Sequence, residues 1–156
     1  MNAAASAGLE ALLERSESVS ALDALLDGVR SGAGGQLAII GGEAGVGKTT
    51  LLRMFCATRA DGARALWGAC EPLLTPRPLG PFFDIAEAVG GELAALLDAS
   101  AKPHEVVAAL LRELRARAPA ILILEDLHWA DDATLDVLTL LAGRIATVPA
   151  LVLVTY

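Results

Sequence analysis

Three stretches of nearly continuous apolar residues divide the chain, and each has the length of a strand. They are Gln36–Gly41, Ala120–Leu124 and Ala150–Tyr156. An apolar run without alternating polar residues fits a strand that is buried on both faces, as in a parallel sheet. A further strand is predicted at Ala63–Ala69, directly after the Asp61–Gly62 turn.

Between these stretches, apolar residues recur at the spacing of an α-helix. The first helix is predicted to begin at Ser16, which can cap it, and Leu22, Leu26 and Val29 lie on its apolar stripe. Strands that alternate with helices in this way predict an α/β fold with a mostly parallel sheet. The other helices are expected from Lys48 to about Arg59, at Phe82–Val89, at Glu92–Leu97, from Pro103 up to Pro119, and from Asp131–Asp132 up to Val148–Pro149.

A glycine-rich turn joins the first strand to the helix that begins at Lys48. From Gly42 onward it fits the pattern G-x-x-x-x-G-K-S/T, in the strand–loop–helix order of a phosphate-binding loop. Glycines let backbone N–H groups approach phosphates, and the following helix directs its positive dipole end at them. The alternative is a glycine-rich turn with a solvated lysine. The predicted nucleotide-binding residues are Gly42, Glu43, Ala44, Gly45, Val46, Gly47, Lys48, Thr49 and Thr50.

Within this loop, Lys48 is predicted to bridge the β- and γ-phosphates and the Thr49 hydroxyl to ligate Mg²⁺. The buried strand Ala120–Leu124 runs directly into two acids, Glu125 and Asp126. Ligands of doubly wound sheets bind beyond the carboxyl ends of the strands, where the loop also lies. One carboxylate is expected to hold the metal with Thr49 and the other to orient the attacking water, so Lys48 and both acids are the predicted catalytic residues. The alternative is that both acids cap the following turn.

Four nearby residues receive structural interpretations. His128 is interpreted as a structural histidine rather than a γ-phosphate sensor, and Trp129 as a packing residue rather than a stack for adenine. Asp131 is expected to cap a helix rather than bind metal. Arg77, in the proline-rich stretch Glu71–Pro81, is expected to be solvated.

Composition and charge limit the kinds of partner that the chain is expected to bind. The 156 residues carry a net charge of −7 and show no lysine- or arginine-rich run, so we expect no direct grip on nucleic acid. No apolar run reaches membrane-spanning length, and the N-terminus lacks the pattern of a signal peptide, which favours a cytoplasmic location. Cys56 and Cys70 lack metal-site spacing and are interpreted as reduced, partly buried thiols. Guanine-specific proteins of this class use an N-K-x-D motif, which cannot occur here because Asn2 is the only asparagine, so ATP is favoured by elimination.

Taken together, these motifs resemble the ATPase domain of AAA/STAND-type proteins, close to the large ATP-binding LuxR-family transcriptional regulators of actinobacteria. The matching stretches are Leu12–Arg15, the loop GEAGVGKTT, Trp67–Pro81 and Ile121–Asp136. The resemblance implies a Walker A motif ending at Lys48 and Thr49 and a Walker B motif ending at Glu125 and Asp126. It further implies a three-layer P-loop NTPase fold, ATP and Mg²⁺ as cofactors, and a switch role in transcription regulation.

The chain departs from this family at three points. Many relatives have aspartate where this chain has Glu125, which leaves open which acid holds Mg²⁺. Ser18 stands where relatives carry a glutamate. Relatives also continue Thr-Tyr-Arg, with the arginine sensing the γ-phosphate, whereas this sequence stops at Tyr156.

The family's sheet order, 5-1-4-3-2, would place Ala150–Tyr156 between the loop strand and the strand at Ala120–Leu124. The expected organisation is a flexible segment at 1–11 and an ATPase domain at 12–156, truncated before the fifth strand. Gln36–Ile40 would then be an open sheet edge, and we expect the chain to self-associate or to be completed by other sequence.

Three functional hypotheses follow. The leading one is a Mg·ATP-binding module with slow hydrolysis. The second is a nucleotide-holding switch or assembly fragment without turnover. The third, a small-molecule kinase, would need an acceptor site and an arginine-bearing lid, for which Pro72–Pro81 is a poor candidate.

Overall fold

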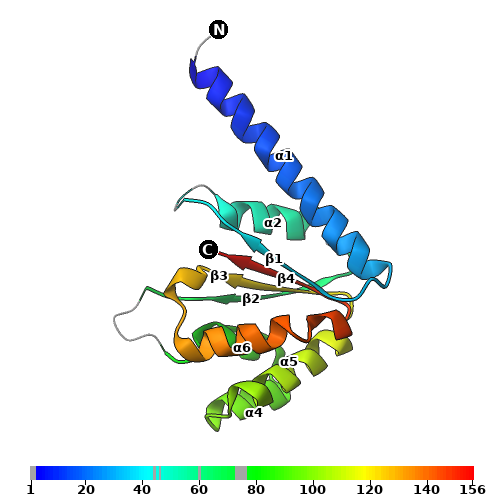
Figure 1. Cartoon of the computed structure of the whole chain (residues 1–156), viewed down its shortest axis with the longest axis vertical. Coiled ribbons are helices and arrows are strands. Elements are labelled where there is room, and N and C mark those ends of the chain that lie inside the picture. The colour runs from blue at the N-terminus through cyan, green and yellow to red at the C-terminus, as the bar shows by residue number, and fades with distance from the viewer. Residues whose placement is uncertain (1–2, 44, 46, 60, 73–76) are drawn as a thin grey trace.

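The computed structural model describes residues 3–43, 45, 47–59, 61–72 and 77–156, with side chains described from residue 16 onward. The helices are α1 (Ala3–Arg30), α2 (Lys48–Thr58), α3 (Gly80–Val89), α4 (Gly91–Asp98), α5 (Pro103–Ala116) and α6 (Asp132–Ala142) (Figure 1). The strands are β1 (Gln36–Ile40), β2 (Arg64–Ala69), β3 (Ala120–Glu125) and β4 (Ala150–Thr155). Two short 3-10 turns, η1 (Leu127–Trp129) and η2 (Ile145–Thr147), follow β3 and α6.

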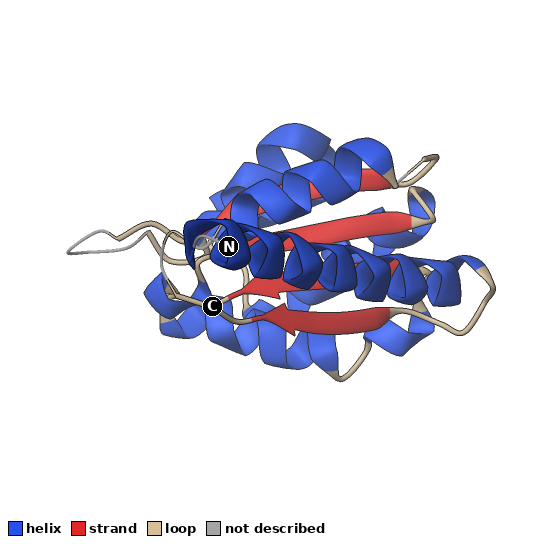
Figure 2. Cartoon of the chain, turned by 90° about the horizontal axis from the view of Figure 1, so that it is seen from above, coloured by secondary structure: helices blue, strands red, loops and turns tan. Residues whose placement is uncertain are grey.

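The four strands lie side by side in one parallel sheet (Figure 2). Their order is β1-β4-β3-β2. This confirms the predicted α/β fold and the predicted place of the last strand between the loop strand and β3. Every residue of β3 and β4 is buried, which explains their unbroken apolar sequences, because both strands are central and covered on both faces. Among the described strands, β1 and β2 form the two edges of the sheet.

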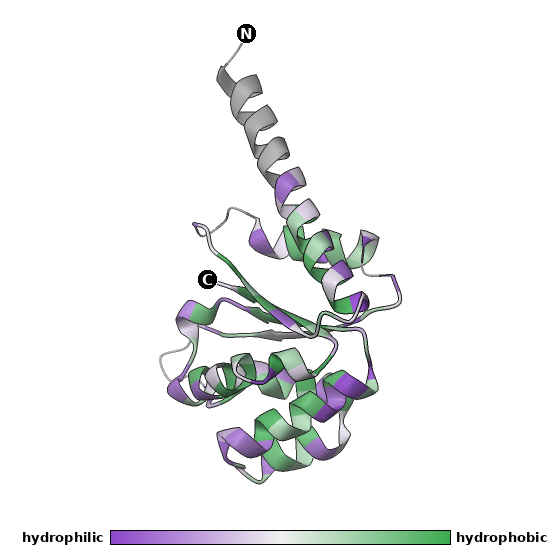
Figure 3. Cartoon of the chain, turned by 45° about the vertical axis from the view of Figure 1, so that its right-hand side comes forward, coloured by the Kyte–Doolittle hydropathy of each residue, from purple (hydrophilic) through white to green (hydrophobic). Residues whose placement is uncertain are grey.

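Alternate residues of the central strands serve two separate cores. Ile121, Ile123, Leu151 and Leu153 pack with residues of α1 and α2 on one face. On the other face, the even-numbered neighbours pack against α3, α4, α5 and α6. The sheet is therefore the middle of three layers, as predicted. Figure 3 shows that α4 and α5 carry both hydrophobic and hydrophilic residues, as expected for helices with one face on a core.

Close packing of α3 on β2 depends on a glycine. A Cβ atom at Gly68 would lie 2.1 Å from the carbonyl oxygen of Pro81, in the first turn of α3. Real Cβ atoms do not approach a backbone oxygen this closely, so any larger residue would push α3 away from the sheet. The glycine thereby lets α3 pack directly on β2.

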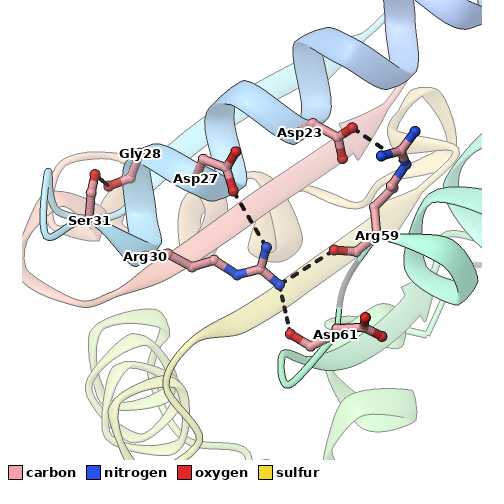
Figure 4. A network of polar contacts seen from close by, with 7 residues as sticks. All are labelled: Asp23, Asp27, Gly28, Arg30, Ser31, Arg59 and Asp61. Atoms are coloured by element: carbon pink, nitrogen blue, oxygen red, sulfur yellow. Dashed lines mark hydrogen bonds and ion pairs between the residues drawn. The ribbon is translucent and has the colours of Figure 1, made fainter.

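A polar network ties the end of α1 to the turn after α2 (Figure 4). Arg30 donates from Nη2 to the carbonyl oxygens of Asp61, at 2.7 Å, and Arg59, at 3.4 Å. Arg59 also pairs with Asp23 at 3.6 Å. Exposed ion pairs contribute little stability, at most ~1 kcal/mol, so the Arg59–Asp23 pair adds little to the stability of the fold.

Element boundaries differ from the predicted ones in one important case. The first helix begins at Ala3, so Ser16 lies inside it and does not cap it. The residues before Ser16 are rich in alanine, leucine and glutamate, and their helix propensity extends the helix toward the N-terminus. The last helix is also shorter than predicted: α6 ends at Ala142, before Gly143, and the separate turn η2 fills part of the interval up to Val148. The other predicted ends agree within a few residues. None of the described helices is long and apolar enough to cross a membrane.

Candidate functional site

The glycine loop connects β1 to α2 at the carboxyl edge of the sheet. Gly45 and Gly47 have φ angles of 82° and 93°, in the left-handed region that glycine adopts without strain. Gly47 is the N-cap of α2, and its carbonyl accepts the first-turn bond from the Leu51 N–H at 2.9 Å. Ala44 and Val46, also predicted to bind nucleotide, lie outside the described residues.

Lys48 folds back over this loop. Its Nζ atom donates to the carbonyl oxygens of Gly42, at 2.5 Å, and Glu43, at 3.3 Å. These two contacts hold the ammonium group inside the curve of the loop, at the N-terminus of α2. A positive charge beside free N–H groups and a positive helix dipole forms a site for an anion.

The first acid contacts the loop directly. Thr49 donates from Oγ1 to Oε1 of Glu125 at 2.5 Å, although the two residues are 76 positions apart. Glu125 is the last residue of β3 and only 9% exposed. The sheet order thus brings a hydroxyl and a carboxylate together, which is an oxygen pair suited to Mg²⁺.

The second acid leaves the sheet. Asp126 has a φ angle of 58° and caps the 3-10 turn η1. Whereas Glu125 is buried, Asp126 is half-buried and lines a cleft of about 950 Å³ together with Gly42, Gly45, Gly47, Lys48, Thr49 and Thr50. A volume of this size is within the range of small-molecule and cofactor sites.

Comparison with known proteins decides the family. The sequence matches the family described as AAA ATPase domain over residues 11–154. The chain belongs to this family. Membership implies a nucleotide-binding and nucleotide-hydrolysing domain, in agreement with the loop and the acids.

One protein of similar sequence and one solved structure of similar fold can be compared with this AAA ATPase domain. An uncharacterized protein of Rhizobium meliloti (strain 1021) is 30% identical over 188 aligned positions, covering 92% of this chain and 18% of that protein. The solved structure of Drosophila ORC bound to GC-rich DNA and Cdc6 aligns at 20% identity and a TM-score of 0.50, over 92% of this chain and 50% of that one. The structural likeness supports the fold alone. The chain spans half or less of the length of both proteins.

Three aromatic side chains line the wall of the cleft in this AAA ATPase domain. They are His128, Trp129 and Tyr156. The interpretation of Trp129 as a packing residue is wrong, because it is 46% exposed. His128 is also exposed rather than embedded in a core; its ring lies 5.0 Å from that of Trp129 and 6.2 Å from that of Tyr156. The 3-10 turn η1 turns both residues outward, and the sequence gives no sign of that turn.

Asp131 caps α6, as predicted. It accepts from the Thr134 N–H at 3.0 Å and also from the Leu79 N–H at 3.2 Å, which links α6 to the start of α3. Arg77 is exposed but is not simply solvated: its guanidinium carbon lies 3.3 Å from the ring centroid of Phe83. It lines a smaller pocket of about 160 Å³ that shares Trp129 with the larger cleft beside the glycine loop.

Both cysteines are free thiols, as predicted. Burial raises the pKa of Cys56, in α2, to about 11. Burial also raises the pKa of Cys70 to about 11, and there the negative charges of Asp131, Asp126 and Asp84 add to the effect. The Cys70 thiol is therefore partly buried and lies in the negative field of three aspartates, one of which, Asp126, follows β3.

Sequence reasoning missed two residues that contact this acidic end. The Cys70 N–H donates to the Glu125 carbonyl at 2.9 Å, and the Thr155 hydroxyl accepts from the Asp126 N–H at 2.8 Å. The available signal for Thr155 was a hydroxyl residue ending an otherwise apolar strand. For the metal, the described residues contain no cluster of three or more histidine, cysteine or acidic ligands. Mg²⁺ in nucleotide sites needs only one or two protein oxygens beside phosphates and water, so Thr49 and Glu125 fit it.

Proposed function

We propose that this AAA ATPase domain binds Mg·ATP in the cleft between the glycine loop and the acidic end of β3, and hydrolyses it slowly. The observation that carries the proposal is the 2.5 Å contact between Thr49 and Glu125, which joins the two motifs at one point. The chemistry of such sites is positioning and charge stabilisation rather than covalent catalysis.

Each acid receives a separate role. Glu125 is buried and bonded to Thr49, so we assign it to Mg²⁺, where a hydroxyl and a carboxylate are needed side by side. Asp126 lines the open cleft, so we assign it to the attacking water. The bound metal would supply charge neutralisation of the phosphates. Lys48 would move from its loop carbonyls to the β- and γ-phosphates.

Phosphate release at saturating Mg·ATP tests this assignment. The wild-type chain is expected to release phosphate, Lys48→Ala to bind ATP roughly 10- to 100-fold more weakly, and Asp126→Asn to bind ATP with little turnover. Asparagine is a matched replacement, since it removes the charge and still accepts the left-handed conformation. Full activity in Asp126→Asn would contradict the role of Asp126.

A module that holds ATP without turnover is the second candidate. Within the described wall of the cleft, Lys48 supplies the only permanent positive charge. Fast phosphoryl transfer in this class uses an additional arginine, which favours slow or no hydrolysis in these residues. Stable ATP binding with no released phosphate in the wild type would select this candidate.

Two finer proposals concern the whole protein. The resemblance of Trp67–Pro81 and Ile121–Asp136 to ATP-binding LuxR-family regulators supports a role as the nucleotide switch of a transcription regulator. ATP-dependent DNA binding by the intact protein would test it.

The β1 edge supports association. β1 pairs with β4 on one side, and Ile39 is 66% exposed. Exposed apolar edges pair readily with other strands. Light scattering should show self-association that Ile39→Lys reduces; a monomer at high concentration would contradict it.

A further inference from the structure

The peptide unit between Glu125 and Asp126 is the point where β3 leaves the sheet. The β3–β4 ladder ends at Leu124 and Val154, one residue before it. The two polar groups of this peptide point to opposite neighbours: the Glu125 carbonyl accepts from the Cys70 N–H, and the Asp126 N–H donates to the Thr155 hydroxyl. Both strands beside β3 therefore hold the same peptide.

The contact on the β4 side is made by a side chain where a strand would normally offer a carbonyl. The next backbone N–H along the chain, that of Tyr156, points to β1 and donates to the Ile40 carbonyl at 3.1 Å. The Thr155 hydroxyl, rather than a backbone carbonyl of β4, accepts the hydrogen bond from the Asp126 N–H at 2.8 Å. Thr155 is 1% exposed, so water does not readily substitute for its hydroxyl.

This bond acts on an unusual backbone conformation. A residue other than glycine at a φ of 58° is strained, and aspartate tolerates it better than glutamate. The Asp126 carbonyl accepts from the Trp129 N–H at 2.9 Å and begins η1. With its N–H and carbonyl both fixed, Asp126 has its side chain on the nucleotide cleft rather than on the sheet face.

We propose that Thr155 is a positioning residue for hydrolysis. Its hydroxyl holds Asp126 in the left-handed conformation that keeps the carboxylate on the cleft. Through the pairing of Thr155 with Ile40, the same residue also links this acid to the strand that enters the glycine loop. The inference rests on the proposed function, in which Asp126 orients the attacking water.

Three variants test the role of the hydroxyl. Thr155→Val removes it at nearly constant shape, and Thr155→Ser retains it. Thr139→Val is the matched control, because its hydroxyl bonds the Leu135 carbonyl on the exposed side of α6. Phosphate release at saturating Mg·ATP, the Kd for ATP, and hydrogen exchange at the Asp126 amide are measured on the full chain.

Thr155→Val is expected to lower the turnover rate by about tenfold or more, a loss within the range for a displaced general base, with the Kd for ATP unchanged. Thr155→Ser should restore turnover, and Thr139→Val should match the wild type. The Asp126 amide should be protected in the wild type and in Thr155→Ser and exchange rapidly in Thr155→Val.

Wild-type turnover in Thr155→Val, or equal losses in the valine and serine variants, would overturn the inference. A wild-type chain that binds ATP without releasing phosphate would instead refute the proposed hydrolysis. The exchange rate of the Asp126 amide then decides the positioning contact by itself: an amide that stays protected in Thr155→Val would overturn it.

Discussion

The glycine loop, Gly42–Thr49, and the acidic end of β3, Glu125–Asp126, meet at one cleft, which Asp126 lines while Glu125 lies buried behind it, but they are held by contacts of different range. Lys48 bonds carbonyls five and six residues away, within the loop itself. The acids depend on Thr49, 76 positions from Glu125, and on Thr155, 29 positions from Asp126. The loop is therefore a local structure, whereas the acidic end exists only when the sheet is assembled.

The largest effect is expected when the positive charge of Lys48 is removed from the glycine loop, the half of the site that is held by local contacts. Lys48→Ala should raise the Kd for Mg·ATP roughly 10- to 100-fold, since a hydrogen bond to a charged group contributes ~1.5–3 kcal/mol. Its unfolding free energy should stay at the wild-type value, because both hydrogen bonds of the lysine to the described residues lie within its own loop. Fluorescence titration with an ATP analogue measures the affinity. Lys102→Ala, on the exposed start of α5, is the control and should bind normally.

The next change targets the contact between the halves. Thr49→Val should lower the free energy of unfolding by ~1–3 kcal/mol, because it leaves the buried Glu125 carboxylate without its donor. Urea unfolding monitored by circular dichroism gives the value. The neighbouring Thr50→Val, an exposed position, should stay near the wild type. Equal effects of the two variants would mean that the contact contributes nothing to folding.

A glycine pair tests how local the loop is. Gly45 has a φ of 82° and open space where a Cβ would lie, so Gly45→Ala introduces backbone strain of ~1–2 kcal/mol without a clash. If the loop is local, it relieves this strain by changing its own conformation, so ATP binding should weaken while the unfolding midpoint stays unchanged. Gly41→Ala meets equally open space without a positive φ and should leave both quantities unchanged. A lower unfolding midpoint in Gly45→Ala would show that the loop is coupled to the core.

The smallest expected effect is a change in the pKa of a cysteine, which depends on the charges near it. Asp126→Asn should lower the pKa of Cys70, which the Asp126 charge helps to raise, and leave that of Cys56, which only burial raises. The pH dependence of alkylation at each cysteine, followed by mass spectrometry, measures both values. A shift at Cys56, or none at Cys70, would contradict the assignment of these charges.

The same thiols set an alkaline limit on stability. Their folded pKa values of about 11 exceed the ordinary value of 9.0, so the folded state favours the protonated thiols. Their contribution to stability is complete below pH 9 and is lost as the pH rises toward 11. Substitution of both cysteines by alanine should flatten the fall in unfolding free energy over this interval.

The same difference between contacts of near and of distant residues explains which features could be predicted from the sequence. The loop, the helix cap at Asp131 and the buried strands follow from neighbouring residues, and their spacing was enough to place them. The sheet order followed from the family resemblance. The left-handed backbone at Asp126 and its bond to Thr155 arise only when β3 and β4 lie side by side. No pattern of neighbouring residues in the sequence therefore predicts them. The exposure of Trp129 follows from that same turn.

The central claim is that the loop and the acidic end form one Mg·ATP site. The most direct measurement is calorimetric titration of ATP with and without Mg²⁺, on the wild type and on Glu125→Gln. We predict that Mg²⁺ strengthens ATP binding to the wild type, and that Glu125→Gln removes this gain but keeps the magnesium-free affinity. If Mg²⁺ strengthened binding equally in both chains, Glu125 would not belong to the site and the account would be wrong.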